Sequence, residues 1–149
     1  MKCIAMAGLV TSVLLLFFAS TASAAEFVGF IKSLEGQTTV LRDGEDREAT
    51  VGMEIKEGDI VKTGADGSAG LIFSDDTIIT MGPRTEFVVE DYLFEPLEGR
   101  LGFVARILRG TISYLSGQIE KLSPGTVQLK TPAATIGVRG THVLIKVEP

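Results

Sequence analysis

The sequence lacks most of the side chains that build metal centres, disulfides and nucleophilic active sites. It contains one cysteine, Cys3, one histidine, His142, and no tryptophan among 149 residues. A metal site built on histidine needs a second histidine or carboxylates at a known spacing, and a disulfide needs a second cysteine. The only glycine pair of the type found in phosphate-binding loops, Gly137 and Gly140, lacks the accompanying lysine. We therefore expect no metal site and no cofactor.

Runs of lysine or arginine are also missing, and the formal net charge is −5. An acidic surface repels nucleic-acid phosphates, and a chain without basic clusters has no electrostatic patch for anionic lipid. Nucleic acid is therefore not an expected partner. Because 45% of the residues are hydrophobic and 22% are charged, the chain can bury a core. Its length fits one domain.

The first 24 residues have the pattern of a signal peptide. Lys2 precedes an uncharged apolar run over residues 3–19, and small residues fill positions 20–25. Ala22 and Ala24 stand where signal peptidase requires small side chains, which predicts cleavage between Ala24 and Ala25. The alternative is a retained anchor, since residues 3–25 carry no charge and could span a bilayer. We expect cleavage, and hence a periplasmic or secreted protein with no stable membrane span.

Closely spaced glycines separate short segments rich in β-branched and aromatic residues, which is typical of an all-β domain. Because several segments are apolar on consecutive residues, we expect strands packed on both faces in a solenoid-like stack. A small β-barrel or a sandwich is the alternative. The expected strands are 27–34, 38–42, 60–63, 69–73, 77–81, 86–92, 102–108, 111–115, 127–130 and 142–147.

One region has helical spacing, with Leu97, Leu101, Ala105 and Leu108 recurring at intervals of three or four. Glycines at 99 and 102 each weaken a helix by about 1 kcal/mol relative to alanine. We therefore expect strand or irregular structure there.

Carboxylates are the most numerous candidates for chemistry, and Asp75 and Asp76 form an adjacent pair. A glycosidase needs two such groups facing each other across a cleft, whereas acidic residues at turns usually face solvent. Ser68 lies in a glycine-rich segment but lacks the glycine two positions earlier that a nucleophile elbow requires. We therefore expect no enzyme. A cryptic hydrolase that uses Asp75 and Asp76 is the least favoured hypothesis.

Four motifs in order resemble the FecR domain family. They are Gly58-Asp59 with Thr63-Gly64, GLIFSDDT over 70–77, LRGTISYLSG over 108–117, and KTPAATIGVRGT over 130–141. The resemblance as a whole extends over about residues 36–147. The family commonly has glycine at or beside the position of Asp76, so the second motif departs from it. The resemblance implies a periplasmic, β-rich, solenoid-like domain over residues 25–149 with no catalytic residues.

The best-known members of that family relay iron–siderophore uptake to a sigma factor through a cytoplasmic segment and a membrane span. Only Met1 and Lys2 precede the apolar run here, so we do not expect that role to transfer intact. The first hypothesis is a module that binds an envelope or membrane protein and takes part in signalling. The second is an envelope module that binds a glycan or another ligand. Both leave the oligomeric state open.

Arg139, Gly140 and Thr141 are the candidate binding residues. The planar guanidinium of arginine pairs well with carboxylate or phosphate groups. The alternative is structural, because glycine between two strands is typical of a turn. We favour the turn.

Overall fold

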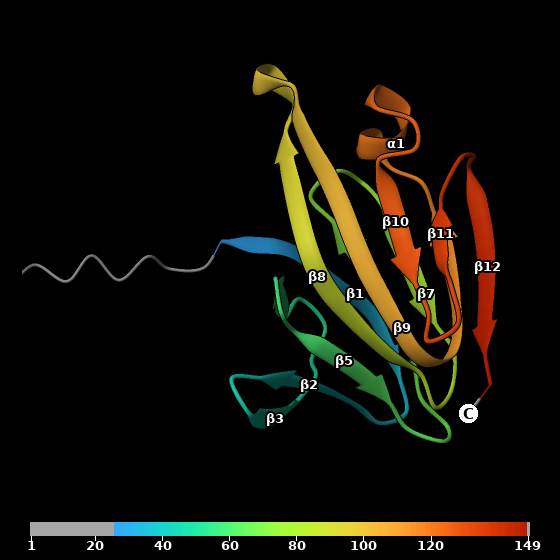
Figure 1. Ribbon diagram of the computed structural model, residues 1–149. Coiled ribbons are helices and arrows are strands. Elements are labelled where there is room, and N and C mark those ends of the chain that lie inside the picture. Colours follow the sequence, from blue (N-terminus) through green and yellow to red (C-terminus); the bar gives the residue numbers. More distant parts are fainter. Residues whose placement is uncertain (1–25, 149) are drawn as a thin grey trace, which may run out of the picture.

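A computed structural model describes residues 26–148 as an almost entirely β structure, which confirms the all-β prediction (Figure 1). The predicted signal peptide and its cleavage site at Ala24–Ala25 lie outside the described residues. The helical elements are a 3-10 turn at Pro96–Glu98 and the short helix α1 at Gln118–Leu122. The strands are β1 (Phe27–Glu35), β2 (Thr38–Arg42), β3 (Glu45–Glu48), β4 (Glu54–Lys56), β5 (Ile60–Thr63), β6 (Ser68–Phe73), β7 (Ile78–Met81), β8 (Glu86–Glu95), β9 (Arg100–Leu115), β10 (Val127–Lys130), β11 (Thr135–Gly137) and β12 (His142–Val147).

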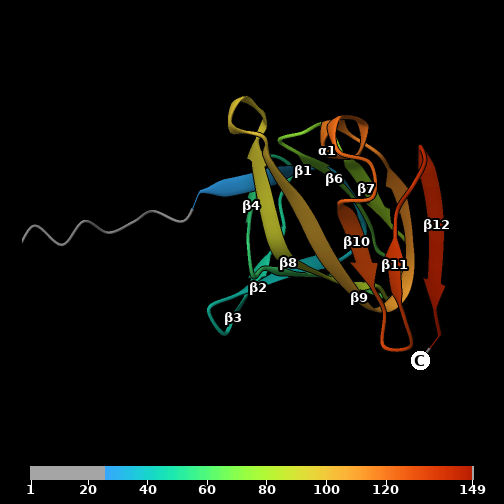
Figure 2. The ribbon, with the colours of Figure 1, turned by 45° about the horizontal axis from the view of Figure 1, so that its top comes forward.

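The strands form one curled sheet that turns at the long strand β9. The pairing runs in the order β3-β2-β5-β8-β9-β7-β6-β1-β4. The first half of β9 pairs with β8 and with β10, and its second half pairs with β7 and β12. Figure 2 shows the first half of β9 between β8 on one side and β10 on the other.

Gly110 lets β9 change direction between its two halves. It has φ 94°, a left-handed value that glycine adopts without strain. A Cβ atom at this position would collide with Thr85 Oγ1, which accepts a hydrogen bond from Thr111 N at 3.0 Å. Two residues earlier, at Leu108, the pairing with β8 shifts by one residue, since Arg109 faces Glu86 whereas Ile107 faces Phe87. This bulge bends β9 and shifts which residues face inward.

The core lies inside the curl. Buried residues of β9 are Phe103, Ala105 and Ile107 before the bulge, then Ile112 and Tyr114 after it. Their change from odd to even positions is what an extra residue in a strand produces, because side chains alternate faces with a period of two. A cluster of aromatic rings fills the centre, formed by Phe73, Phe87, Tyr92 and Phe103.

Each expected strand overlaps an observed strand. Residues 97–108 do not form an α-helix, in agreement with the expectation from Gly99 and Gly102, because a single 3-10 turn ends at Glu98 and β9 begins at Arg100. The expected strands 102–108 and 111–115 are parts of the single strand β9. The short strands β3, β4 and β11 and the helix α1 were not expected.

The described strands do not form the expected solenoid-like stack. All pairs are antiparallel except β9 with β10, whereas stacked coils would bring parallel strands together. Short turns between consecutive strands favour antiparallel hairpins, since a parallel connection needs a longer crossover. The curled sheet is closer to the barrel alternative.

Candidate functional site

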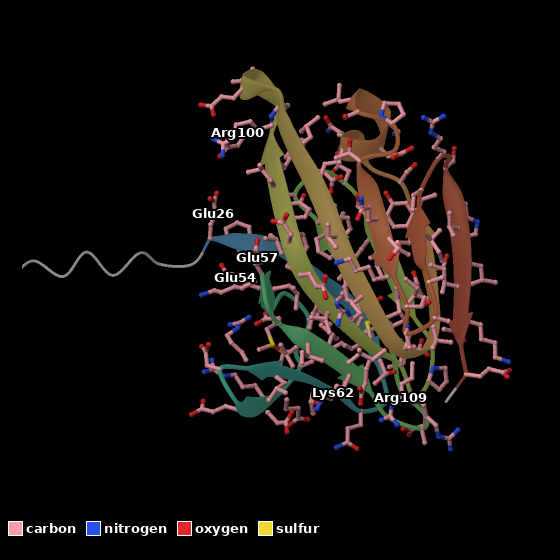
Figure 3. The ribbon with its side chains drawn as sticks, in the orientation of Figure 1. Glu26, Glu54, Glu57, Lys62, Arg100 and Arg109 are labelled. Carbon is pink, nitrogen blue, oxygen red and sulfur yellow. The ribbon has the colours of Figure 1, made fainter. Side chains whose placement is uncertain are left out.

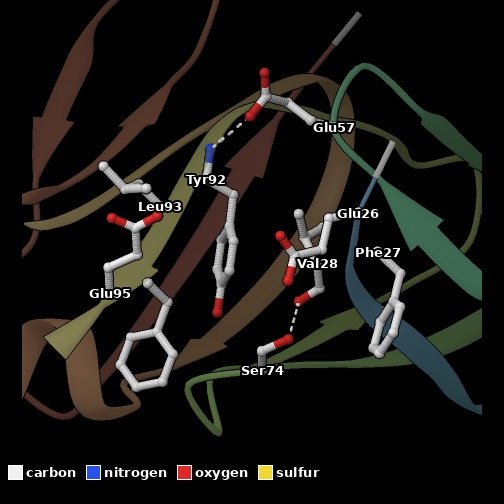
Figure 4. A pocket seen from close by; sticks show the side chains of 9 residues that line it. Glu26, Phe27, Val28, Glu57, Ser74, Tyr92, Leu93 and Glu95 are labelled. Atoms are coloured by element: carbon white, nitrogen blue, oxygen red, sulfur yellow. Dashed lines mark hydrogen bonds between the residues drawn. The ribbon is translucent and has the colours of Figure 1, made fainter. Parts of the chain in front are cut away.

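A pocket of about 370 Å³ lies between the second half of β8 and the start of β1 (Figure 4). In this view the Glu26 carboxylate lies between the rings of Tyr92 and Phe27. Glu57, which lies in the turn between β4 and β5, also lines the pocket. The residues that line the pocket are Glu26, Phe27, Val28, Glu57, Ser74, Tyr92, Leu93, Phe94 and Glu95. Carboxylates and aromatic rings therefore line the same space.

The pocket adjoins a part of β8 that has no strand on one side. β5 pairs with β8 only from Glu86 to Val88. Gly58 N then donates to Val89 O at 2.8 Å. Beyond this point the Tyr92 N–H donates to a side chain, Glu57 Oε2, at 3.2 Å. The edge of β8 from Asp91 to Glu95 is thus open on the side away from β9.

The charge around the pocket is negative. Figure 3 shows Glu26, Glu54 and Glu57 on the same side of the molecule, near the start of β1. Within residues 26–148 none of these three carboxylates forms an ion pair. Glu95 is partly neutralised, because Arg100 lies 3.2 Å from its carboxylate. The carboxylates of Glu26 and Glu57 therefore leave the pocket lining negatively charged.

Asp75, proposed above as half of a carboxylate pair, is fully buried beneath this pocket. Its carboxylate accepts hydrogen bonds from Thr77 Oγ1 at 2.7 Å, from Tyr92 Oη at 2.9 Å and from Ile119 N at 3.2 Å. Burial is the main cause that raises the pKa of Tyr92 well above its ordinary value, and the negative charge of Asp75 is the second cause. The carboxylate therefore ties the β6–β7 turn to β8 and α1.

Asp76 points to solvent and meets Gln118 Nε2 at 3.1 Å. Its φ of 68° lies in the left-handed region, where aspartate is one of the few tolerated residues besides glycine. This explains how aspartate fits where the FecR resemblance leads one to expect glycine. Since Asp75 is buried and Asp76 is exposed, the two carboxylates do not face a common cleft, and the hydrolase hypothesis gains no geometric support.

The candidate binding residues Arg139, Gly140 and Thr141 form an exposed loop between β11 and β12. Gly140 has φ 138°, and Thr141 O accepts a hydrogen bond from Ser116 N at 2.8 Å. These are features of a turn. They lie apart from the residues that line the β8 pocket.

The lone histidine has a partner that the sequence did not indicate. His142 Nε2 lies 2.7 Å from Ser113 Oγ, across the pairing of β12 with β9. A catalytic serine–histidine pair needs a third group that orients the histidine. Within residues 26–148 no carboxylate is hydrogen-bonded to His142. The contact is a cross-strand hydrogen bond on the surface.

Comparison with known proteins identifies the family. The model of the family described as FecR protein matches residues 59–149, which is more than half of the chain. The chain belongs to the FecR family. No curated protein and no solved structure matches it. The FecR match includes the β8 side of the pocket, Tyr92 to Glu95, but not Glu26 or Glu57.

Two residues of the first FecR motif, Asp59 and Thr63, connect neighbouring strands. Asp59 is buried and accepts hydrogen bonds from Arg42 Nε and Lys56 N, both at 2.8 Å. Thr63 Oγ1 donates to Gly82 O at 2.6 Å and accepts from Thr85 N at 2.9 Å. These contacts join β5 to β2, to β4 and to the segment before β8. The polar residues of this motif therefore stabilise the fold.

Residues 26–148 also lack two features, a metal-binding cluster and a membrane-spanning helix. No group of histidine, cysteine and carboxylate side chains there is arranged to hold a metal ion. No helix there is both long enough and apolar enough to cross a membrane. The pocket is the feature that sequence reasoning missed, because separate segments meet there through strand pairing.

Proposed function

We propose that this FecR-family chain is an exported, non-enzymatic module that binds a protein partner in the cell envelope and acts in signalling or regulation. Membership of the FecR family supports a regulatory role in the envelope. The single observation that carries the proposal is the open edge of β8 beside the acidic, aromatic pocket. Unpaired strand edges are surfaces to which other chains add by backbone hydrogen bonding.

Export rests on the signal-peptide pattern of residues 1–24, which leaves a module of residues 25–149 in the periplasm or outside the cell. Its contact residues include those around the pocket. Arg139, Gly140 and Thr141 stay as secondary candidates, since their loop is exposed. Asp75 serves the fold, and no hydrolytic role is assigned to it.

The test determines whether the protein is exported and whether it can be crosslinked to a protein partner. The full chain, tagged at its C-terminus, is expressed in a host that carries its native envelope, and the exported product is sequenced from its N-terminus. Chemical crosslinking in whole cells then compares the wild type with Leu93→Lys and with the control Leu97→Lys. Leu93 lines the pocket, whereas Leu97 is fully exposed on the turn after β8.

We expect the exported product to begin at Ala25. We also expect a defined protein crosslink that is lost in Leu93→Lys and retained in Leu97→Lys. Retention on peptidoglycan without any protein crosslink would support the glycan-binding alternative instead. Robust hydrolysis of sugar or ester substrates would overturn the non-enzymatic assignment.

A further inference from the structure

We propose that the β8 pocket binds the lysine or arginine side chain of an extended partner segment, which adds as a strand to the free edge of β8. This deepens the proposed function and rests on it. The pocket then determines which partner segments are accepted, while the strand edge supplies backbone hydrogen bonds that do not depend on sequence.

The backbone of β8 supports strand addition. The Tyr92 N–H points away from β9 and donates to the Glu57 carboxylate, which takes the place of the carbonyl group of an incoming strand. Because backbone groups alternate along a strand, the N–H and C=O of Phe94 face the same open side. Movement of the exposed Glu57 side chain would free the Tyr92 donor for a neighbouring strand.

The side chains around the edge select a cation. Glu26 and Glu57 line the pocket, and neither forms an ion pair within residues 26–148. Phe27 is 47% exposed, so part of its ring is open to a ligand. An ammonium or guanidinium group over an aromatic face is attracted to the ring, and a nearby carboxylate adds to that attraction. An anionic side chain would be repelled by the same groups.

The size of the pocket fits this occupant. Its volume of about 370 Å³ lies near the lower end of the range for small-ligand sites. Such a space holds one long side chain together with its flanking backbone better than it holds a large cofactor.

Other strand edges are less suited to this role. Every residue of β3 is exposed and charged, and charged edges disfavour pairing with another chain. The edge strand β12 carries the exposed Leu144 beside Lys146, so it offers no acidic pocket for a basic segment. The structure thus assigns cation recognition to β8.

The experiment uses the exported full chain and blocked pentapeptides as probes. The first peptide is Thr-Val-Lys-Val-Thr, and matched peptides carry arginine, norleucine or glutamate at the centre. Binding is followed by two-dimensional NMR of the protein backbone amides, which gives both the dissociation constant and the location. We expect the lysine and arginine peptides to shift the Tyr92 and Phe94 amides, and norleucine to weaken binding at least about tenfold.

Matched variants separate charge from hydrogen bonding. Glu57→Gln keeps an acceptor for the Tyr92 N–H but removes the charge, so it should weaken the lysine peptide and leave the norleucine peptide unchanged. Glu35→Gln is the control, since Glu35 is an exposed carboxylate at the far end of β1. Equal affinity for the lysine and norleucine peptides, absence of binding, or shifts at β12 in place of β8 would overturn the inference. If Leu93→Lys still removes the protein crosslink in that case, the proposed function stands while cation recognition falls.

Discussion

The phenol of Tyr92 and the carboxylate of Asp75 are joined by a hydrogen bond of 2.9 Å, and the Asp75 N–H donates back to the same phenol oxygen at 2.9 Å. Tyr92 therefore contributes to two parts of the molecule, through its phenol and through its backbone N–H. Its ring end anchors a buried carboxylate, while its backbone N–H lies on the open edge of β8. The stability of the core and the shape of the pocket are linked through this one residue.

Removal of the Tyr92 hydroxyl should destabilise the fold. In Tyr92→Phe, the buried Asp75 N–H loses its acceptor and the carboxylate loses one donor. An unsatisfied buried polar group costs about 1–3 kcal/mol, so we expect a loss of that order in the free energy of unfolding, measured by urea denaturation.

Tyr114→Phe is the matched control for this prediction. Within the described residues the buried Tyr114 hydroxyl makes no hydrogen bond of normal geometry, because the neighbouring Thr77 hydroxyl donates to Asp75. Its removal should therefore be neutral or stabilising. Equal losses in the two variants would contradict the role given to the Tyr92–Asp75 pair.

The adjacent aspartates should respond differently to loss of charge. Asp75→Asn places an amide donor among groups that all donate to this side chain, namely Thr77 Oγ1, Tyr92 Oη and Ile119 N. Since a hydrogen bond to a charged group contributes about 1.5–3 kcal/mol, we expect a loss of at least about 2 kcal/mol in stability. The exposed Asp76→Asn should stay within about 0.5 kcal/mol of the wild type. Thermal unfolding of both variants measures the difference, and equal melting temperatures would contradict a structural role for Asp75.

Gly110 should tolerate no side chain. Gly110→Ala forces a Cβ atom into Thr85 at a residue with φ 94°, so we expect a loss above about 2 kcal/mol or failure to fold. Gly102 lies in the same strand, and a Cβ there meets no atom within 4 Å, so Gly102→Ala should stay folded. Circular dichroism and urea denaturation compare the two. A stable Gly110→Ala variant would contradict the account of the β9 bend.

Alkaline pH should unfold the protein through its tyrosines. The chain has two tyrosines, and burial raises the pKa of both Tyr92 and Tyr114 well above the ordinary value. A phenol whose pKa is raised by folding stabilises the fold fully below its unfolded pKa of about 10, and this stabilisation is lost as the pH rises above that value. We therefore expect phenolate absorbance to appear only together with unfolding.

A pH titration that records absorbance and circular dichroism in parallel tests this prediction. In the double variant Tyr92→Phe and Tyr114→Phe, the decline in stability above about pH 10 should be shallower than in the wild type. Phenolate absorbance at an intact fold would contradict the burial of these groups.

Local sequence predicted the strands well because side-chain alternation and turn glycines are local properties. The strands that were not predicted are ones that depend on pairing with another strand. Every residue of β3 is charged, and this segment becomes a strand through its pairing with β2. Likewise, the glycine at 110 was interpreted as a break between strands, although its contact with Thr85 makes it a bend within one strand.

The sequence by itself determined the all-β class, the signal-peptide pattern, the scarcity of reactive side chains and the FecR motifs. Only the tertiary structure decided that β9 turns one curled sheet, that Asp75 is buried and that Glu26, Glu57 and Tyr92 surround one pocket. The reason is physical. Strand formation depends on neighbours along the chain, whereas an open strand edge and a pocket depend on which distant strands pair and where their pairing ends.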